Sequence, residues 1–545
     1  MTSSGIWTRT LALVVAVALM LASPLAAFAA ERAGQGSTEK PKLLLVGFGD
    51  SLTHGTMDAT NNAINTLNAY LQKIAESLSA VSTLTFSQPL FDLAENRIEP
   101  FKIPTNLGVD GADAFSVEGI EYYQRAGVDT SYVTEDYLGD AWLPSGFEDT
   151  YDKVFYPINL KARKKASMVD STVWLVNQHA GQVQPAVIFW VGNNDSSTAA
   201  LGEGGQNPVF VPIPLEQVSP ELTPLVRTLL VQGEASGELS FEPYTMTSIE
   251  RNLTVREDFV DQYNHLLARL KSEVNPAAAM KLFLLTLPYY SSVGYLFDSE
   301  DLEFYFRKLD PGYTVPETFT RVTPAGDPIT DPTKGDRISL LTFGLMYALL
   351  DTGYSVDYVN EVLEIDGQQR DGLVLSEEEQ AYIRSRIDGF NSTIRDAAAA
   401  YGSGASVVEI GDYLNDGLTG QTPVVIGDTV LSRKWIRGSS FSFDGVHPNY
   451  TAQALIANFV LEKLNAALGL NAPLHDLEAI LGTDPYIDRD GDGWASGPSY
   501  SAPGIPELLF LFKDPDDSSA EVQPVLPEDV WRLISNAILK EFLGG

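Results

Sequence analysis

A serine that follows a short apolar run is the residue of this chain best placed to act as a nucleophile. Residues 43–48 are apolar, and Gly-Asp-Ser-Leu-Thr-His-Gly follows them at positions 49–55. The two glycines permit a sharp turn that would present the hydroxyl of Ser51 at the end of a buried strand. A simpler interpretation is that Asp50 and Ser51 only cap the helix that follows such a turn.

A serine hydroxyl needs a base to become a nucleophile, and the chain has five histidines. His447 stands out because Asp444 lies three residues before it, across a glycine turn. The carboxylate could accept a hydrogen bond from one ring nitrogen and leave the other to take the serine proton. We interpret the other four as core or turn histidines: His54, His179, His265 and His475.

An asparagine follows a second apolar run. Asn194 stands in Gly-Asn-Asn-Asp at 192–195, directly after the apolar residues 186–191. An asparagine amide can donate to the negative oxygen that develops when a carbonyl is attacked, and losing one such donor typically costs roughly 3 kcal/mol of transition-state stabilisation. The alternative is an ordinary Asn-Asp turn.

These side chains need a scaffold that brings distant parts of the chain together. Four apolar runs have the length of buried strands, at residues 43–48, 186–191, 281–287 and 406–410. Apolar spacing predicts helices at residues 61–78 and 247–274. Further helices are predicted at 161–176, which begins with basic residues, at 376–400, which a capping box opens, and at 450–468. Such alternation is typical of a parallel sheet covered by helices, in which ligands bind beyond the carboxyl ends of the strands. Ser51 and Asn194 would both lie at that edge.

Four short blocks, in their order along the chain, resemble those of the SGNH hydrolases, the GDSL lipase and esterase family. They are Gly-Asp-Ser-Leu, Asn-Leu-Gly-x-x-Gly, Gly-x-Asn-Asp and Asp-x-x-His-Pro, at residues 49–52, 106–111, 192–195 and 444–448. The resemblance implies an α/β fold, a three-layer α/β/α sandwich with a mainly parallel five-stranded sheet. The Gly-x-Ser-x-Gly turn of the other large esterase fold is absent, because Thr53 stands two residues after the serine.

The resemblance also implies roles for five residues. Ser51 would be the nucleophile, and its backbone N–H would be the first oxyanion donor. Gly111 would supply a second backbone N–H, and Asn194 a side-chain donor. His447 would act as general base and acid, oriented by Asp444. These roles describe a serine ester hydrolase, a lipase or carboxylesterase that forms an acyl-enzyme with a small-molecule or lipid ester and needs no cofactor for catalysis.

Two other functions stay open at this point. On the same fold, the protein could be a deacetylase of acylated carbohydrate. It could instead be a catalytically idle surface or binding protein that depends on calcium, although a binding module has no need for this serine, histidine, aspartate and asparagine together. Apolar and aromatic residues in the long insertions favour acyl-chain substrates.

The composition excludes several kinds of partner and site. The chain has 36 lysines and arginines against 72 aspartates and glutamates, which gives a net charge of −36 over 545 residues. A surface this negative repels nucleic acid, so we expect no nucleic-acid partner. The absence of cysteine excludes a thiol nucleophile, disulfides and thiolate metal sites.

The two ends of the chain differ from its middle. Residues 1–29 have the charged, apolar and small-residue regions of a cleavable signal peptide, so we expect a secreted or periplasmic protein with no lipobox cysteine and no transmembrane segment in the mature chain. Residues 40–471 are predicted to form the hydrolase domain, with insertions at about 196–245 and 291–375. Residues 472–545 are predicted to be an acidic linker and a C-terminal appendage.

An apolar stretch lies inside the second insertion, at residues 338–350. It is too short to span a bilayer, which takes about 20 residues. A buried helix is the favoured interpretation, and a lid over an apolar pocket is the alternative.

Three aspartates near the C-terminus are spaced like the first half of a calcium loop. Asp488, Asp490 and Asp492 alternate with other residues and precede Gly493. Oxygen ligands at alternate positions with a glycine for the turn are typical of calcium loops, but the twelfth position holds Ser499 where such loops have a glutamate. We expect a structural calcium site, with a solvated acidic turn as the alternative.

Overall fold

The computed structural model describes most of the chain between positions 40 and 514. The described residues are 40–122, 132–201, 249–250, 252–316, 318–319, 335–351, 353–365, 367–369, 373–500, 509 and 513–514. The predicted signal peptide, most of the first predicted insertion and the end of the predicted appendage lie outside them.

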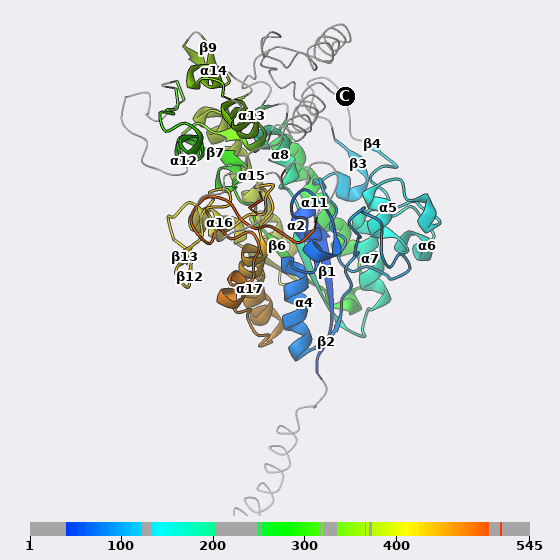
Figure 1. Ribbon diagram of the computed structural model, residues 1–545. Helices are drawn as coiled ribbons and strands as arrows, with labels where there is room; N and C mark the ends of the chain where they lie inside the picture. Colours follow the sequence, from blue (N-terminus) through cyan, green and yellow to red (C-terminus); the bar gives the residue numbers. More distant parts are fainter. Residues whose placement is uncertain are drawn as a thin grey trace, which may run out of the picture.

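Five parallel strands form the central sheet (Figure 1). They are β1 (Lys42–Gly49), β2 (Thr83–Thr85), β5 (Gln184–Trp190), β6 (Lys281–Leu285) and β11 (Ala405–Val408). Their order across the sheet is β11-β6-β5-β1-β2, and every neighbouring pair is parallel. The carboxyl ends of the strands therefore share one edge. The predicted α/β class with a mainly parallel five-stranded sheet is confirmed.

Two groups of helices cover the faces of this sheet. The first group pairs α4 (Tyr70–Val81) with α17 (Tyr450–Leu468), which lie side by side in Figure 1 and contact β2 and β11. In the second group α7 (Met168–Gln178) and α15 (Glu377–Tyr401) pack on α11 (Arg256–Glu273) and contact β1, β6 and β11. Helices on both faces explain why the strands are nearly continuous apolar runs.

Shorter elements connect the layers. The other α-helices of the described residues are α2 (Ser51–His54), α3 (Ala63–Thr66), α5 (Thr150–Phe155), α6 (Ile158–Ala162), α8 (Asn194–Leu201), α12 (Ser299–Leu309), α13 (Leu340–Asp351), α14 (Val356–Asn360), α16 (Ile410–Leu418) and α18 (Leu477–Leu481). Antiparallel pairs join β3 (Ile120–Glu121) with β4 (Tyr132–Val133), β7 (Leu296–Phe297) with β8 (Ile338–Ser339), β9 (Glu364–Ile365) with β10 (Gln368–Gln369), and β12 (Val425–Ile426) with β13 (Thr429–Val430). Short 3₁₀ turns are η1 (Ser116–Glu118), η2 (Pro144–Gly146), η3 (Pro276–Ala278) and η4 (Tyr290–Ser292). Over the part of the chain that the structure describes, no helix has both the length and the apolar character needed to cross a membrane.

Two predicted helices are interrupted. In place of one helix over 61–78 the chain forms α3 and α4, because Ala69 is extended at φ −72° and ψ 158°. Leu67, which precedes this break, is 45% exposed. The predicted helix 161–176 is split into α6 and α7, because Arg163 adopts a φ of 58° and ends the first. Apolar spacing runs through the first break and does not reveal it, whereas the second break lies in the basic run 163–165.

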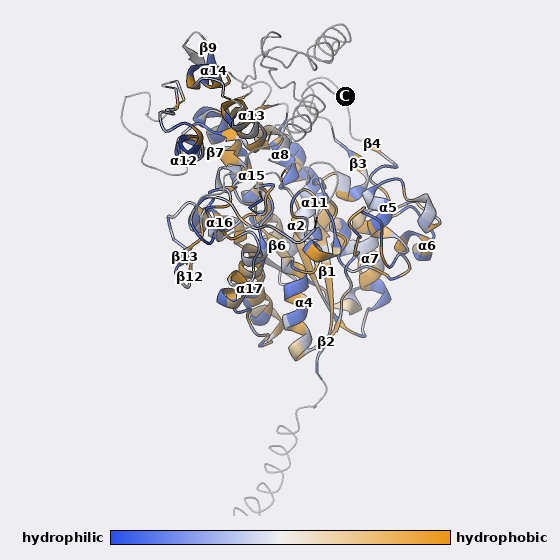
Figure 2. Cartoon of the chain, in the orientation of Figure 1, coloured by the Kyte–Doolittle hydropathy of each residue, from blue (hydrophilic) through white to orange (hydrophobic). Residues whose placement is uncertain are grey.

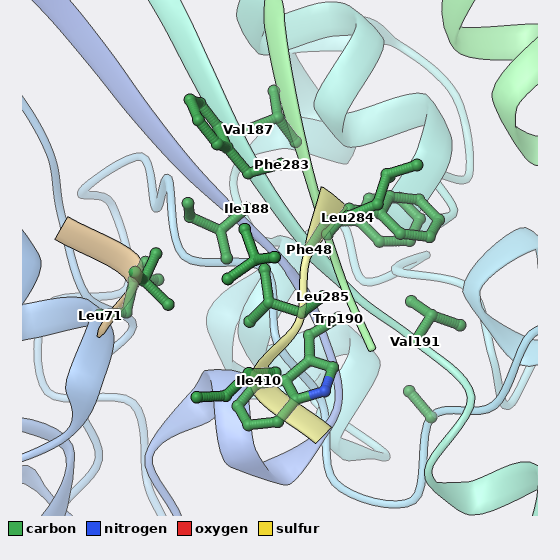
Figure 3. Packing of buried hydrophobic residues seen from close by; sticks show 14 of the residues in the cluster. Phe48, Leu71, Val187, Ile188, Trp190, Val191, Phe283, Leu284, Leu285 and Ile410 are labelled. Carbon is green, nitrogen blue, oxygen red and sulfur yellow. The ribbon is translucent and has the colours of Figure 1, made fainter. Parts of the chain in front are cut away.

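The main apolar cluster fills the space between the sheet and its helices. Phe48 of β1 stacks on Phe189 of β5 with ring centroids 4.4 Å apart, and Phe189 meets Tyr263 of α11 at 5.4 Å. Figure 3 shows side chains of β1, β5 and β6 gathered in this cluster, among them Trp190 and Phe283. In Figure 2, β1 is coloured as hydrophobic whereas α4 carries a hydrophilic side.

A second apolar cluster lies around α12 and α13. It gathers large side chains from distant parts of the chain: Phe297, Tyr305, Phe343, Tyr347, Trp435 and Trp494. The apolar stretch 338–350 forms most of α13, and its side chains Phe343 and Met346 are completely buried in this cluster. The stretch therefore packs as core, in agreement with the favoured interpretation.

Replacing one sheet phenylalanine tests the importance of the main cluster. Phe283 of β6 is fully buried, so we expect Phe283→Ala to lower the free energy of unfolding by about 3–5 kcal/mol. Phe101 is 70% exposed and provides the matched control, with an expected loss below about 1 kcal/mol for Phe101→Ala. Denaturant unfolding followed by circular dichroism measures both, and equal losses would contradict this account.

Candidate active site

Ser51 lies where the carboxyl end of β1 turns into the short helix α2, of which it is the first residue. Asp50 caps this helix, since its Oδ1 accepts the backbone N–H of Leu52 at 3.0 Å. The turn needs glycine before it, because a Cβ on Gly49 would lie 2.4 Å from Thr53 Oγ1 and 2.5 Å from the carbonyl oxygen of Trp190. Asp50 thus has the capping role of the simpler interpretation, and the turn also presents Ser51 at the sheet edge.

A cavity of about 260 Å³ lies beyond this edge and is bordered by four of the predicted residues: Ser51, Gly111, Asn194 and His447. They come from positions far apart in the sequence, and the parallel sheet brings three of their loops to one side. Most of the remaining wall is apolar, with side chains that include Leu52, Trp190, Leu201, Val293, Leu414, Leu418 and Phe441. The arrangement suits a ligand that combines one polar reacting group with an apolar part.

The fifth predicted residue, Asp444, lies behind His447 and holds its ring. Asp444 Oδ2 and His447 Nδ1 are 2.7 Å apart. Asp444 Oδ1 also accepts the backbone N–H groups of Val446 and His447, each at 2.8 Å. Because Nδ1 faces the carboxylate, the Nε2 atom of the ring is the one left for the cavity. The predicted pairing of these two residues therefore has the geometry that orients a general base.

The charges of this pair stabilise each other. Burial is the largest single effect and would lower the pKa of His447. The charge and hydrogen bond of Asp444, together with the charges of Asp110 and Asp50, outweigh it and raise the pKa to about 9. Burial alone would raise the pKa of Asp444, yet the histidine and the backbone donors hold it below its ordinary value. A protonated His447 is therefore favoured well above the range of an unperturbed histidine.

Two further donors border the same cavity. Gly111 has a φ of 71°, a conformation that favours glycine, and a Cβ there would meet nothing within 4 Å. Asn194 is the first residue of α8, and its Nδ2 donates to the carbonyl of Ala112 at 3.1 Å. This bond ties the asparagine to the loop of Gly111 and uses one of its two amide hydrogens.

Sequence reasoning missed a second asparagine at this edge. Asn193 borders the cavity, and its Nδ2 donates to Asp50 Oδ2 at 2.8 Å. Its carbonyl accepts the Tyr290 hydroxyl at 2.7 Å. Burial raises the pKa of Asp50 to about 6 even with the bond from Asn193. Asn193 thus links the turn that carries Ser51 to the turn that carries Asn194. The only sign of this role in the sequence is the doubled asparagine of Gly-Asn-Asn-Asp.

Among the described residues, His447 is the one histidine that borders the cavity. His54 is fully buried, its Nδ1 lies 2.9 Å from the carbonyl oxygen of Gly108, and burial lowers its pKa. His265 Nε2 lies 3.1 Å from Glu118, and His475 Nε2 lies 2.8 Å from the carbonyl of Lys73. The contacts of His54 and His475 agree with the interpretation of these histidines as core or turn residues. For His265 that interpretation is wrong, because its side chain is 57% exposed on the long helix α11.

The three aspartates of the predicted calcium loop lie together. One oxygen from each of Asp488, Asp490 and Asp492 falls within 4.8 Å of the others. Asp488 also accepts the N–H groups of Gly491 and Gly493, at 2.7 and 2.8 Å, which folds the loop around it. The donor set fits a hard cation such as Ca²⁺, and calcium binding there stays a prediction.

No protein-family model matches the chain, and no curated protein matches it either. The geometry of the site and the four sequence blocks are therefore the observations that bear on function.

Calcium should stabilise the protein through the loop 488–493. A ligand that binds only the folded state at 100 times its dissociation constant adds about 2.7 kcal/mol, so we expect millimolar Ca²⁺ to raise the melting temperature by several degrees. Asp490→Asn removes one ligand charge and should abolish most of this shift. Differential scanning fluorimetry with Ca²⁺, with Mg²⁺ and with a chelator provides the measurement. An identical melting temperature in all three would favour the solvated acidic turn.

The pKa of His447 predicts an alkaline rate profile for any reaction in which its ring acts as base. Only the neutral ring accepts a proton, so activity should rise with pH and reach half of its plateau near the pKa of about 9. An unperturbed histidine would place this midpoint near pH 6.5. Asp444→Asn should move the midpoint toward that value and lower the plateau about a thousandfold or more. A wild-type midpoint below pH 6 would exclude His447 as the base.

Proposed function

We propose that this protein is a serine ester hydrolase that works through an acyl-enzyme on Ser51. One observation carries the proposal: a serine at a strand end, a histidine held by a buried aspartate, and two further donors border one mostly apolar cavity. Each of these residues also belongs to a block that resembles the SGNH hydrolases. Membership of that family is part of the proposal.

The first half of the proposed reaction forms the acyl-enzyme. The Ser51 hydroxyl attacks the ester carbonyl while His447 Nε2 takes its proton, and the carbonyl oxygen becomes an oxyanion. The backbone N–H groups of Ser51 and Gly111 and the amide of Asn194 donate to this oxyanion. Each such donor is worth about 3 kcal/mol in a site that excludes water. His447 then returns the proton to the alcohol oxygen, the C–O bond breaks, and the acyl group stays on Ser51.

The second half repeats these steps with water. His447 takes a proton from water, and the hydroxyl oxygen attacks the acyl carbon of the Ser51 ester. The same donors hold the second oxyanion. The bond to the Ser51 oxygen then breaks, that oxygen recovers its proton from His447, and a carboxylic acid leaves. Asp444 keeps the ring oriented and balances the positive charge that it carries between the two proton transfers.

The cavity favours substrates with an apolar acyl group. Leu52, Val293 and Phe441 are among its walls, and burial of apolar surface gives roughly 25 cal/mol per Å² of binding free energy. The volume of about 260 Å³ is close to the lower limit of typical ligand pockets, roughly 300 Å³. We therefore propose that short and medium acyl chains are preferred, as in a carboxylesterase.

A neighbouring polar cavity gives the second candidate function its support. This cavity of about 570 Å³ shares Tyr289 and Ser292 with the first one. Most of its other walls are polar or charged side chains of the kind that bind hydroxyl groups, including Arg384, Asp388, Asp412, Asn415 and Gln421. Deacetylation of an acylated carbohydrate is therefore the alternative, with the sugar placed on the polar side.

Hydrolysis of p-nitrophenyl esters from acetyl to palmitoyl tests the proposal. We expect a maximum at short or medium chains and a loss of activity in Ser51→Ala by about 10⁴-fold or more, because this variant lacks the proposed nucleophile. Ser79→Ala is the control, since Ser79 lies in α4 and donates to Ala75 at 2.7 Å. Its rates should equal those of the wild type.

The outcomes separate the candidates. Activity on acetyl esters alone, together with release of acetate from acetylated oligosaccharides, would favour the deacetylase. Full activity in Ser51→Ala would show that the nucleophile is wrong. No hydrolysis of any ester would leave the idle binding protein as the better interpretation.

A further inference from the structure

A buried carboxylate that the proposed mechanism does not use lies next to the catalytic aspartate. Asp58 has no exposed surface and belongs to the tight turn in which Met57 and Thr60 pair. Both central residues of this turn have left-handed backbones, with φ of 55° at Asp58 and 51° at Ala59. This conformation is unfavourable for alanine, so the turn needs support from its surroundings.

The backbone of this turn binds the loop of the catalytic pair. The N–H of Ala59 donates to Asp444 Oδ2 at 2.8 Å, the same oxygen that lies 2.7 Å from His447 Nδ1. The N–H of Asp58 donates to Ser442 Oγ at 3.1 Å. The direction of the Asp444 carboxylate, and with it the orientation of the histidine ring, therefore depends on where this turn lies.

The Asp58 carboxylate fixes the turn through bonds to two distant parts of the chain. Its Oδ1 accepts the backbone N–H of Phe443 at 2.9 Å. Its Oδ2 accepts the hydroxyl of Tyr486 at 2.5 Å and that of Tyr500 at 2.8 Å. Both tyrosines come from the segment 484–500, and their exposed fractions are 0% and 5%.

The same segment is anchored just behind the catalytic histidine. Asp484 Oδ2 accepts both the N–H and the hydroxyl of Thr451 at 2.7 Å, in the first turn of α17. The ring of Tyr486 packs edge-on against Phe443 at 5.4 Å. Gly497 approaches the Phe443 ring so closely that a Cβ would lie 2.4 Å from it. These contacts keep the two hydroxyl groups in place over Asp58.

Electrostatics explains why two hydroxyl donors are needed at this point. Burial and the nearby charge of Asp444 raise the pKa of Asp58 to about 7. The hydroxyl groups of Tyr486 and Tyr500 and the N–H of Phe443 stabilise the charged form against this effect. Without these donors, the charged form of Asp58 would be strongly destabilised, because it is buried beside the charge of Asp444.

We propose that the segment 484–500 is part of the catalytic apparatus, in which Tyr486 and Tyr500 act through Asp58 to position the Asp444–His447 pair. They are positioning residues, since neither the tyrosines nor Asp58 are among the described residues that border the cavity. The inference rests on the proposed ester hydrolysis.

Removal of the two hydroxyl groups tests this proposal in the full chain. Tyr486→Phe, Tyr500→Phe and the double variant keep the aromatic packing and delete the bonds to Asp58. Tyr500→Phe also removes the acceptor of Asn65, whose Nδ2 donates to the Tyr500 hydroxyl at 2.7 Å, so Tyr486→Phe is the cleaner single variant. We expect the double variant to lose at least about tenfold in kcat for p-nitrophenyl ester hydrolysis, with KM within about twofold of wild type, because the catalytic pair is misoriented while the cavity walls are unchanged. The kcat of each single variant should lie between those of the double variant and the wild type.

Tyr122→Phe is the matched control, because it also deletes a tyrosine–aspartate bond, that of the Tyr122 hydroxyl to Asp258 at 2.6 Å. It should keep the wild-type kcat. Thermal unfolding of every variant shows whether it is folded at the assay temperature. If the double variant is unfolded at that temperature, the kcat and KM of the two single variants test the proposal instead.

A second measurement does not depend on turnover. In protein labelled with ¹⁵N-histidine, the Nδ1 proton shared with Asp444 gives a resonance that His447→Asn assigns by its disappearance. We expect this resonance to shift or broaden in the double variant and to stay unchanged in Tyr122→Phe.

Wild-type kcat and an unchanged His447 resonance in the double variant would overturn the proposal and leave the segment with a structural role alone. If the wild type hydrolyses no ester, the proposed function fails, while the resonance still decides whether the tyrosines position the pair.

Discussion

The hydrogen bond between Asp444 and His447 is the contact on which the rest of the candidate site depends. A buried carboxylate is tolerated only when its oxygens have donors, and here the ring and three backbone N–H groups supply them. One of these donors comes from Ala59, which is 385 positions away in sequence. The serine loop and the histidine loop must therefore be held in register, and the parallel sheet together with α17 provides the frame for this.

The glycines near Ser51 also show how closely the parts of this site must be held together. Gly47 and Gly49 lie where a Cβ would come within 2.4 Å of Leu71 or Thr53. The sheet edge and the helices behind it thus approach each other as closely as the backbone permits. This close packing delivers Ser51, Asn193 and Asn194 to one side of the sheet, and the second apolar cluster supports the histidine loop through Phe443 and Trp435.

Much of the fold could be predicted from the sequence because the buried strands are uninterrupted apolar runs. Elements and breaks that no apolar pattern marks could not be predicted. β2 is three partly exposed residues, Thr83–Thr85, with no apolar run to mark it. The break between α3 and α4 lies in a stretch whose apolar spacing continues, so only the extended backbone at Ala69 reveals it.

The candidate site shows a similar division. Ser51, Asn194 and His447 stand in short blocks whose residue types have a chemical reason to occur together, and the structure brings them to one cavity. The doubled asparagine is the only local indication of Asn193, and Asp58 has no local pattern, since their importance comes from bonds to residues 143 and 385 positions away. Contacts of that kind depend on the completed fold, and a single sequence does not report them.

The bond between Asp58 and Tyr500 joins residues that are 442 positions apart. During synthesis the serine turn leaves the ribosome long before the tyrosine that completes its surroundings exists. The serine turn consequently reaches its final environment only after residue 500 has been made and has returned to the first strand. Chain closure over this distance makes the arrangement of the candidate site a late event in folding. A polypeptide that ends before Tyr500 would contain every candidate site residue but lack the contacts that position them.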